Sequence, residues 1–200
     1  LRLGLTGDVG AGKSTVRRWL EATGAAAIDA DAVVHDLLAH DGGVRAAVAE
    51  RFGGAVGPGG AIDRAALARA VFADAAALAA LEAILHPRVG ARIDAWLAGV
   101  DAPIAVVEAV KLVEAGLAAR LDAVWLVVAA APERARRLRA RGWDEGEVAR
   151  RMAAAPPLAP RLAVATEVID NTGPPAATVV QLAAALARLA PARARPSGGP

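Results

Sequence analysis

The chain has 200 residues, 56% of them hydrophobic, which excludes a disordered linker and indicates one or two domains around a sizeable core. It has no cysteine, which excludes disulfides and thiolate metal sites, and no charge-free run of about 18 apolar residues, so we expect a cytoplasmic protein without membrane contact. The net charge is only +2 and few groups titrate above neutral pH, so the pI of 9.9 reflects a small arginine excess, and we expect no nucleic-acid partner.

The chain begins with a predicted strand, a glycine loop and a helix. Residues 1–6 form a short, mostly apolar run, and the helical pattern covers 13–22 and stops near Gly24. A second apolar run over 25–29 predicts a parallel strand. Its carboxyl end carries Asp29, with Asp31 just beyond it.

The middle of the chain, from residue 32 to about 97, has a helical pattern that a glycine-rich break interrupts at 53–60. It contains no convincing strand. We therefore interpret it as a helical insertion between two strands of a sheet.

The second half alternates strands with helices. Apolar, β-branched runs over 103–110 and 123–129 predict strands that are buried on both faces, and 167–170 predicts a last one. The remaining segments are a basic helical region over 132–153, in which Asp144 and Glu147 are spaced to cap a second helix, a rigid break at 156–160 and a helix over 175–189. The alternation predicts an α/β fold with a five-stranded, mainly parallel sheet flanked by helices.

The glycine loop matches the phosphate-loop pattern G-x-x-x-x-G-K-[ST] over 7–14, between a predicted strand and a predicted helix. Its glycines let backbone N–H groups point at phosphate oxygens, and the helix that follows adds its positive end. Lys13 is expected to bridge the β- and γ-phosphates, and the Ser14 hydroxyl to hold Mg²⁺. The pattern therefore predicts a nucleoside triphosphate site.

Several uses of a triphosphate are disfavoured by missing residues. Neither of the two lysines, Lys13 and Lys111, follows an asparagine, so the guanine-reading Asn-Lys-x-Asp motif of regulatory GTPases is absent. A motor-type ATPase needs a longer chain and an acidic strand end, for which Glu108 is the candidate. The short chain favours a kinase that acts on a small molecule.

Phosphoryl transfer needs a base for the attacking hydroxyl and cations for the phosphoryl oxygens. Asp29 and Asp31 lie where ligands bind to parallel sheets, and we prefer Asp31 as the base because Asp29 could instead cap the following helix. Arginines follow at spacings of three and four within a helical region that has few acids, at Arg134, Arg137, Arg141 and Arg151. A solvated basic face is the alternative, but we expect Arg137 and Arg141 to contact phosphates.

Together, these segments resemble the dephospho-coenzyme A kinase family. The resemblance rests on GLTGDVGAGKSTV, IDADAVVHDLL, IDRAALARAVFAD, LEAILHPRV, EAGL and EVIDNTG, which follow in the family's order and spacing along nearly the whole chain. It implies transfer of the ATP γ-phosphoryl group to the ribose 3′-hydroxyl of dephospho-coenzyme A, with Mg²⁺, as the last step of coenzyme A biosynthesis. It also implies a phosphate-loop NTPase core over 1–31, 99–131 and 161–190, a helical substrate domain over 32–98 and a lid over 132–160. The composition of 191–200, rich in proline, glycine and arginine, separately predicts a disordered tail.

The resemblance also assigns residues. The ATP-binding residues are Gly10, Ala11, Gly12, Lys13, Ser14 and Thr15, Asp31 matches the catalytic base, and Arg137 and Arg141 match lid arginines that act with Lys13 in catalysis. Arg64, His86 and Arg88 fall in motifs of the substrate domain, although His86 could instead tie a helix end to a neighbouring loop beside Pro87. We expect a monomer or a weak homo-oligomer.

Three positions depart from the family's pattern. Lys111 lies where the family has Pro-Leu-Leu, Ala155 replaces a lid glutamine, and Asp8 replaces a glycine. Lys111 is either a substitute cation near phosphate or a surface lysine. The alternatives to the implied activity are another small-metabolite or nucleoside monophosphate kinase, or a nucleotide-binding protein without catalysis.

Overall fold

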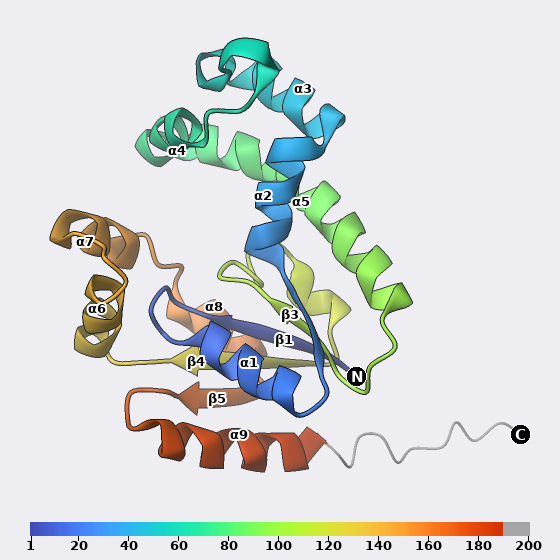
Figure 1. The fold of residues 1–200 in the computed structure, drawn as a ribbon, viewed down its shortest axis with the longest axis vertical. Coiled ribbons are helices and arrows are strands. Elements are labelled where there is room, and N and C mark those ends of the chain that lie inside the picture. The colour runs from blue at the N-terminus through green and yellow to red at the C-terminus, as the bar shows by residue number, and fades with distance from the viewer. Residues whose placement is uncertain (190–200) are drawn as a thin grey trace, which may run out of the picture. The chain divides into compact units, whose positions relative to one another are not determined.

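The computed structural model describes residues 1–189, which form two compact units (Figure 1). The first unit combines Leu1–Ile28 with the chain from Asp101 onward, and the second is Asp29–Val100. The segment expected to be a lid, 132–160, groups with the first unit. The tail expected to be disordered, 191–200, lies outside the described residues.

The first unit is built on a five-stranded sheet in the order β2-β3-β1-β4-β5. The strands are β1 (Arg2–Gly7), β2 (Ala26–Asp29), β3 (Ala105–Glu108), β4 (Ala123–Val128) and β5 (Glu167–Asp170). β1 pairs in parallel with β3 on one side and with β4 on the other, and β4 pairs in parallel with β5. The predicted α/β fold is confirmed, and β1 lies at the centre of the sheet, where the order of the strands reverses.

Two helices pack on one face of this sheet. α1 (Lys13–Ala22) contributes Val16 and Leu20, and α9 (Pro175–Leu189) contributes Leu182 and Ala185. They meet alternate side chains of the strands, which include Leu3, Leu5, Val106, Trp125, Val127 and Ile169. Because this core joins α1 to α9, the last helix within residues 1–189, α9 is fixed close to the element that follows the phosphate loop.

The other helices of the first unit are short. They are α6 (Ala131–Arg139), α7 (Glu145–Ala153), α8 (Leu158–Val164) and the 3-10 helix η3 (Leu117–Arg120). α8 contacts β4. The expected rigid break at 156–160 is only partly correct, because α8 begins within it, at Leu158. Pro157 takes the position before the first helical residue, where its missing N–H costs nothing.

The second unit is helical. It contains α2 (Ala30–His40), α3 (Gly42–Arg51), α4 (Arg64–Ala73) and α5 (Ala75–Gly99), with the 3-10 turns η1 (Gly53–Ala55) and η2 (Pro58–Gly60) in the glycine-rich break. Aspartates cap the starts of all four α-helices, as the sequence of each start favours. Across residues 1–189, no helix is both long enough and apolar enough to cross a membrane.

Candidate functional site

The predicted phosphate loop connects the central strand β1 to α1. Its last glycine, Gly12, has φ of 100° and precedes Lys13, the first residue of the helix. A Cβ on Gly12 would lie 2.1 Å from Asn171 Nδ2, so both the backbone conformation and the available space require glycine. The loop therefore lies at the carboxyl end of a central parallel strand, where open α/β sheets bind ligands.

Lys13 folds back over the loop. Its side chain is buried, and Nζ donates hydrogen bonds to the carbonyl oxygens of Gly7, at 2.9 Å, and Asp8, at 3.3 Å. The ammonium group is thus held at the loop, beside the positive end of α1. Thr15, in the first turn of α1, is exposed and accepts a hydrogen bond from Arg18.

Ser14 lies beside an acid from the neighbouring strand. Its hydroxyl is 3.4 Å from Glu108 Oε1, and Glu108 is buried at the end of β3 with Arg17 3.1 Å from its other oxygen. A hydroxyl and a carboxylate are the hard oxygen donors that Mg²⁺ prefers. No group of three or more His, Cys, Asp or Glu side chains that could hold a metal occurs within residues 1–189. The site therefore fits a magnesium ion that phosphate oxygens help to hold.

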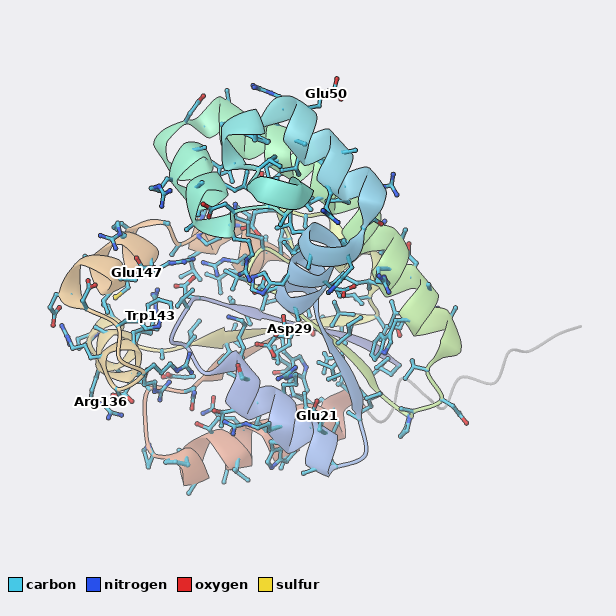
Figure 2. All side chains as sticks on the ribbon, turned by 45° about the horizontal axis from the view of Figure 1, so that its top comes forward. Glu21, Asp29, Glu50, Arg136, Trp143 and Glu147 are labelled. Atoms are coloured by element: carbon cyan, nitrogen blue, oxygen red, sulfur yellow. The ribbon has the colours of Figure 1, made fainter. Side chains whose placement is uncertain are left out.

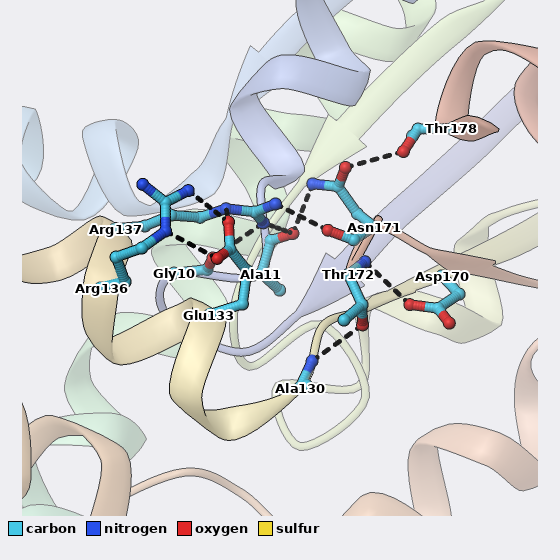
Figure 3. Close-up of polar contacts among 10 residues, drawn as sticks. All are labelled: Gly10, Ala11, Ala130, Glu133, Arg136, Arg137, Asp170, Asn171, Thr172 and Thr178. Carbon is cyan, nitrogen blue, oxygen red and sulfur yellow. Dashed lines mark hydrogen bonds and ion pairs between the residues drawn. The ribbon is translucent and has the colours of Figure 1, made fainter. Parts of the chain in front are cut away.

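Arg137 of α6 binds the loop itself. Its Nη1 donates to the carbonyls of Gly10 and Ala11, its Nη2 donates to the carbonyl of Asn171 at 2.7 Å, and its Nε donates to Glu133 (Figure 3). Three of these acceptors are backbone carbonyls. The guanidinium that we expected on the phosphates is therefore engaged, in this structure, with carbonyls of the phosphate loop and of Asn171.

The other basic side chains of this region are arranged differently from the prediction. α6 ends at Arg139 and Gly142 turns the chain with φ of 86°, so the predicted arginine face is split between two helices. The expectation that few acids neutralise the arginines is also wrong, because three glutamates form ion pairs with them. Glu133 pairs with Arg136 and Arg137, Glu145 with Arg139, and Glu147 with Arg150 and Arg151. Figure 2 shows Arg136 on α6, Glu147 on α7 and Trp143 in the turn between the two helices.

Arg141 is the exception among the predicted arginines. It is exposed, and within the described part of the chain its side chain makes no hydrogen bond or ion pair, although its backbone N–H donates to the carbonyl of Leu138. Its guanidinium is available to an anionic ligand. Glu133, by contrast, is held as a carboxylate, because the hydrogen bond from Arg136 and the charges of Arg136 and Arg137 lower its pKa from 4.5 to about 2.

Asp8 forms a second attachment of the loop. Its two carboxylate oxygens lie 2.7 Å from Arg134 Nη1 and 2.8 Å from Arg161 Nη1. The two arginines come from α6 and α8 and are almost completely buried. Asp8, where the family's pattern has glycine, therefore neutralises charge that would otherwise be buried without a counterion.

In the second unit, the two aspartates lie in different surroundings. Asp29 is the N-cap of α2 and accepts hydrogen bonds from the backbone N–H groups of Asp31 and Ala32, as the capping alternative predicted. The Asp31 side chain lies exposed in the first turn of this helix. Capping fixes the start of the helix and with it the backbone of Asp31.

The residues expected in substrate binding also lie in this unit. Arg64 begins α4, and its Nη2 lies 2.7 Å from His35 Nε2, while Arg88 on α5 is exposed and 3.9 Å from Asp41. His86 and Pro87 lie in the interior of α5, so the alternative in which His86 ties a helix end to a loop is wrong. Arg64 and Arg88 each present a largely exposed cation.

Sequence analysis missed three residues at these places. The sequence predicts Glu108 only as an acid at a strand end. As the last residue of β3, the strand that pairs with β1, it lies within reach of Ser14. Asn171 lies in the EVIDNTG segment and His35 in IDADAVVHDLL, and the sequence pattern assigns a role to neither. Their partners are distant in sequence, so only the fold identifies them.

The chain is similar to known proteins along most of its length. A family model described as dephospho-CoA kinase matches residues 1–176. The dephospho-CoA kinase of Geobacter sulfurreducens is 40% identical over 178 residues, which cover 86% of this chain and 90% of the relative. That of Streptomyces avermitilis is 44% identical over 178 residues, with 87% and 86% covered.

Solved structures agree with this likeness. The crystal structure of TT1252 from Thermus thermophilus is 37% identical, with a TM-score of 0.81, and the match covers 94% of this chain and 97% of that one. A dephospho-CoA kinase from Campylobacter jejuni has a TM-score of 0.68 at 19% identity, with 96% and 98% covered, and at that identity shows the fold alone. The predicted phosphate-loop kinase fold is thereby confirmed.

Proposed function

The chain belongs to the dephospho-CoA kinase family, and from this premise we propose that it transfers the γ-phosphoryl group of ATP to the ribose 3′-hydroxyl of dephospho-coenzyme A. The products are coenzyme A and ADP, so the reaction is the last step of coenzyme A biosynthesis. The observation that carries the proposal is the phosphate loop at the end of β1, with Lys13 folded over it and Ser14 beside Glu108.

The first unit is proposed to bind ATP. Backbone N–H groups between Gly10 and Thr15 would hold the phosphates, and the Lys13 ammonium would move from loop carbonyls to phosphate oxygens. Bound magnesium would neutralise charge on the phosphates, and Ser14 and Glu108 are the residues that would hold it. These groups stabilise the charge that builds up on the oxygens during transfer.

Asp31 is proposed as the base that accepts the proton of the attacking 3′-hydroxyl. Arg141, with its exposed guanidinium, is proposed to contact the phosphoryl oxygens. Arg137 is proposed to contribute to catalysis through its hydrogen bond to the Ala11 carbonyl of the loop. Arg64, His86 and Arg88 are proposed to bind dephospho-coenzyme A, whose phosphate groups match the two cations. A cytoplasmic location and a monomeric or weakly self-associating state remain predictions.

A substrate panel tests the proposal. The purified protein is incubated with ATP and dephospho-coenzyme A, AMP or shikimate, with magnesium and then with excess EDTA, and ADP release is measured. We expect turnover with dephospho-coenzyme A in the presence of magnesium only. Turnover confined to AMP or shikimate would identify a different kinase, and ATP binding without turnover on any acceptor would support a non-catalytic nucleotide-binding protein.

A further inference from the structure

The Ala11 carbonyl in the phosphate loop is held by two side chains. Asn171 Nδ2 donates to it at 2.8 Å and Arg137 Nη1 at 3.1 Å (Figure 3). In a trans peptide the C=O and the next N–H point in opposite directions. Fixing the Ala11 oxygen toward Asn171 and Arg137 therefore fixes the Gly12 N–H in the opposite direction, away from these two side chains. That N–H has no acceptor within residues 1–189.

A third residue sets the orientation of the Asn171 amide. The Thr178 hydroxyl, on α9, donates to Asn171 Oδ1 at 2.8 Å, and both residues are buried, at 4% and 6% exposure. Because a backbone carbonyl only accepts hydrogen bonds, the amide nitrogen must face Ala11, and its oxygen then faces Thr178. The chain of contacts leaves the amide one orientation.

The backbone around Asn171 is also fixed. The Asn171 N–H donates to the carbonyl of Val128 at the end of β4, and Thr172 Oγ1 accepts from the N–H of Ala130. The Thr172 N–H donates to Asp170 Oδ1, which closes the turn after β5. The side chain therefore projects from a rigid segment onto the loop.

We propose that Asn171 is a positioning residue for the triphosphate. Oriented by Thr178, it locks the Ala11–Gly12 peptide so that the Gly12 N–H is preorganised to donate to a phosphate oxygen. Asn171 does not touch the nucleotide; it acts through the loop, and it joins the C-terminal helix α9 to the binding of ATP. The inference rests on the proposed use of ATP by this loop.

Binding measurements on variants test this inference. Asn171→Ala should weaken the binding of ATP by about 10- to 100-fold, because one charge-assisted hydrogen bond loses its preorganised donor. Thr178→Val should weaken it by roughly 3- to 10-fold, since the amide loses only its orienting partner. Thr178→Ser keeps the hydroxyl and should restore wild-type affinity, and the affinity for dephospho-coenzyme A should not change in any variant.

Gln181→Ala provides the matched control. Gln181 lies on the same helix and exchanges two hydrogen bonds with the backbone of Asp170, at 2.9 and 2.8 Å, without touching the loop. It should bind ATP as the wild type does. If Gln181→Ala and Thr178→Val weaken ATP binding equally, Asn171 is merely structural and the inference fails. It fails likewise if the loss of ATP affinity in the variants merely parallels a fall in their melting temperature.

Binding of inorganic triphosphate distinguishes an effect on the phosphate loop from an effect on the adenosine portion of ATP. A residue that positions a phosphate-binding N–H must affect triphosphate and ATP by the same factor, whereas loss confined to ATP would show that Asn171 acts on the adenosine portion and would overturn the inference. A wild type that binds ATP but does not phosphorylate dephospho-coenzyme A would refute the proposed function alone. A wild type that binds neither ATP nor triphosphate would refute both.

Discussion

Asp8 shows how one residue within the phosphate loop can attach the loop to neighbouring helices. The phosphate-loop pattern leaves this position free, yet here the carboxylate meets Arg134 and Arg161, which are 9% and 1% exposed. Two buried guanidinium groups are costly unless a counterion accompanies them. The loop is thereby fastened to α6 and α8 by charge, in addition to the hydrogen bonds of Arg137 and Asn171 to Ala11.

Asp8→Asn tests this attachment. The substitution preserves the shape of the side chain but removes its charge, so we expect the free energy of unfolding to fall by about 3 kcal/mol, as measured by urea denaturation. Asp101→Asn, at an exposed position, serves as the control and should change it by less than about 0.5 kcal/mol. Equal stability of the two variants would mean that Asp8 does not stabilise the arginines.

At the scale of elements, α6 and α7 are held by ion pairs within and between the two helices. Glu133 receives two hydrogen bonds from Arg136, at 2.7 and 2.6 Å, and one from Arg137. Arg139 at the end of α6 pairs with Glu145 at the start of α7, and Arg151 lies 5.6 Å from the Trp143 ring. Much of the arginine charge is therefore used to shape the proposed lid, which leaves Arg141 for a ligand.

The pH dependence of stability tests the pairing of Glu133. Its pKa is lowered from 4.5 to about 2 on folding, so its contribution to stability is present above pH 4.5 and is lost as the pH falls toward 2. The melting temperature of Glu133→Gln should therefore lie below that of the wild type at neutral pH, and the difference should shrink below pH 4.5.

Arg136→Gln is the partner control for this experiment. It removes the largest cause of the shift but leaves Arg137, so it should weaken the pH dependence only in part. Parallel melting curves of wild type and Glu133→Gln from pH 7 to 3 would contradict the assignment.

At the scale of the whole molecule, the proposed reaction uses residues of both units. The phosphate loop, Glu108, Arg137 and Arg141 belong to the first unit, whereas Asp31 belongs to the second. Asp29, at the start of the second unit, has a structural task as the cap of α2. The two aspartates, only two residues apart, can therefore be distinguished by experiment.

Asp31→Asn should lower kcat by roughly 10²- to 10⁴-fold while ATP binding is retained, because the base is lost and the phosphate loop is untouched. Asp29→Asn is the matched control, since asparagine caps a helix as well as aspartate does, and it should retain near wild-type turnover. Steady-state kinetics with saturating ATP measure both. A large loss for Asp29→Asn with none for Asp31→Asn would assign the base to Asp29.

The sequence by itself determined the local parts of the molecule. The predicted helices over 13–22 and 175–189 agree with α1 and α9, and the strands at the phosphate loop and at 167–170 agree within a residue, because apolar periodicity, glycine and proline act over short stretches. The phosphate loop could be recognised for the same reason, since its glycines and Lys13 are neighbours in the chain.

The tertiary structure alone decided which distant side chains meet the loop. The partners of the Asp8 carboxylate, the Ala11 carbonyl and the Ser14 hydroxyl lie more than 90 positions away in the chain, and nothing in the local pattern pairs them. The same cause places Arg137, whose spacing indicated a face for phosphate and whose guanidinium binds loop carbonyls in this structure. Spacing determines which residues share an element, whereas long-range hydrogen bonds and charge pairs, formed only on folding, determine what each of them does.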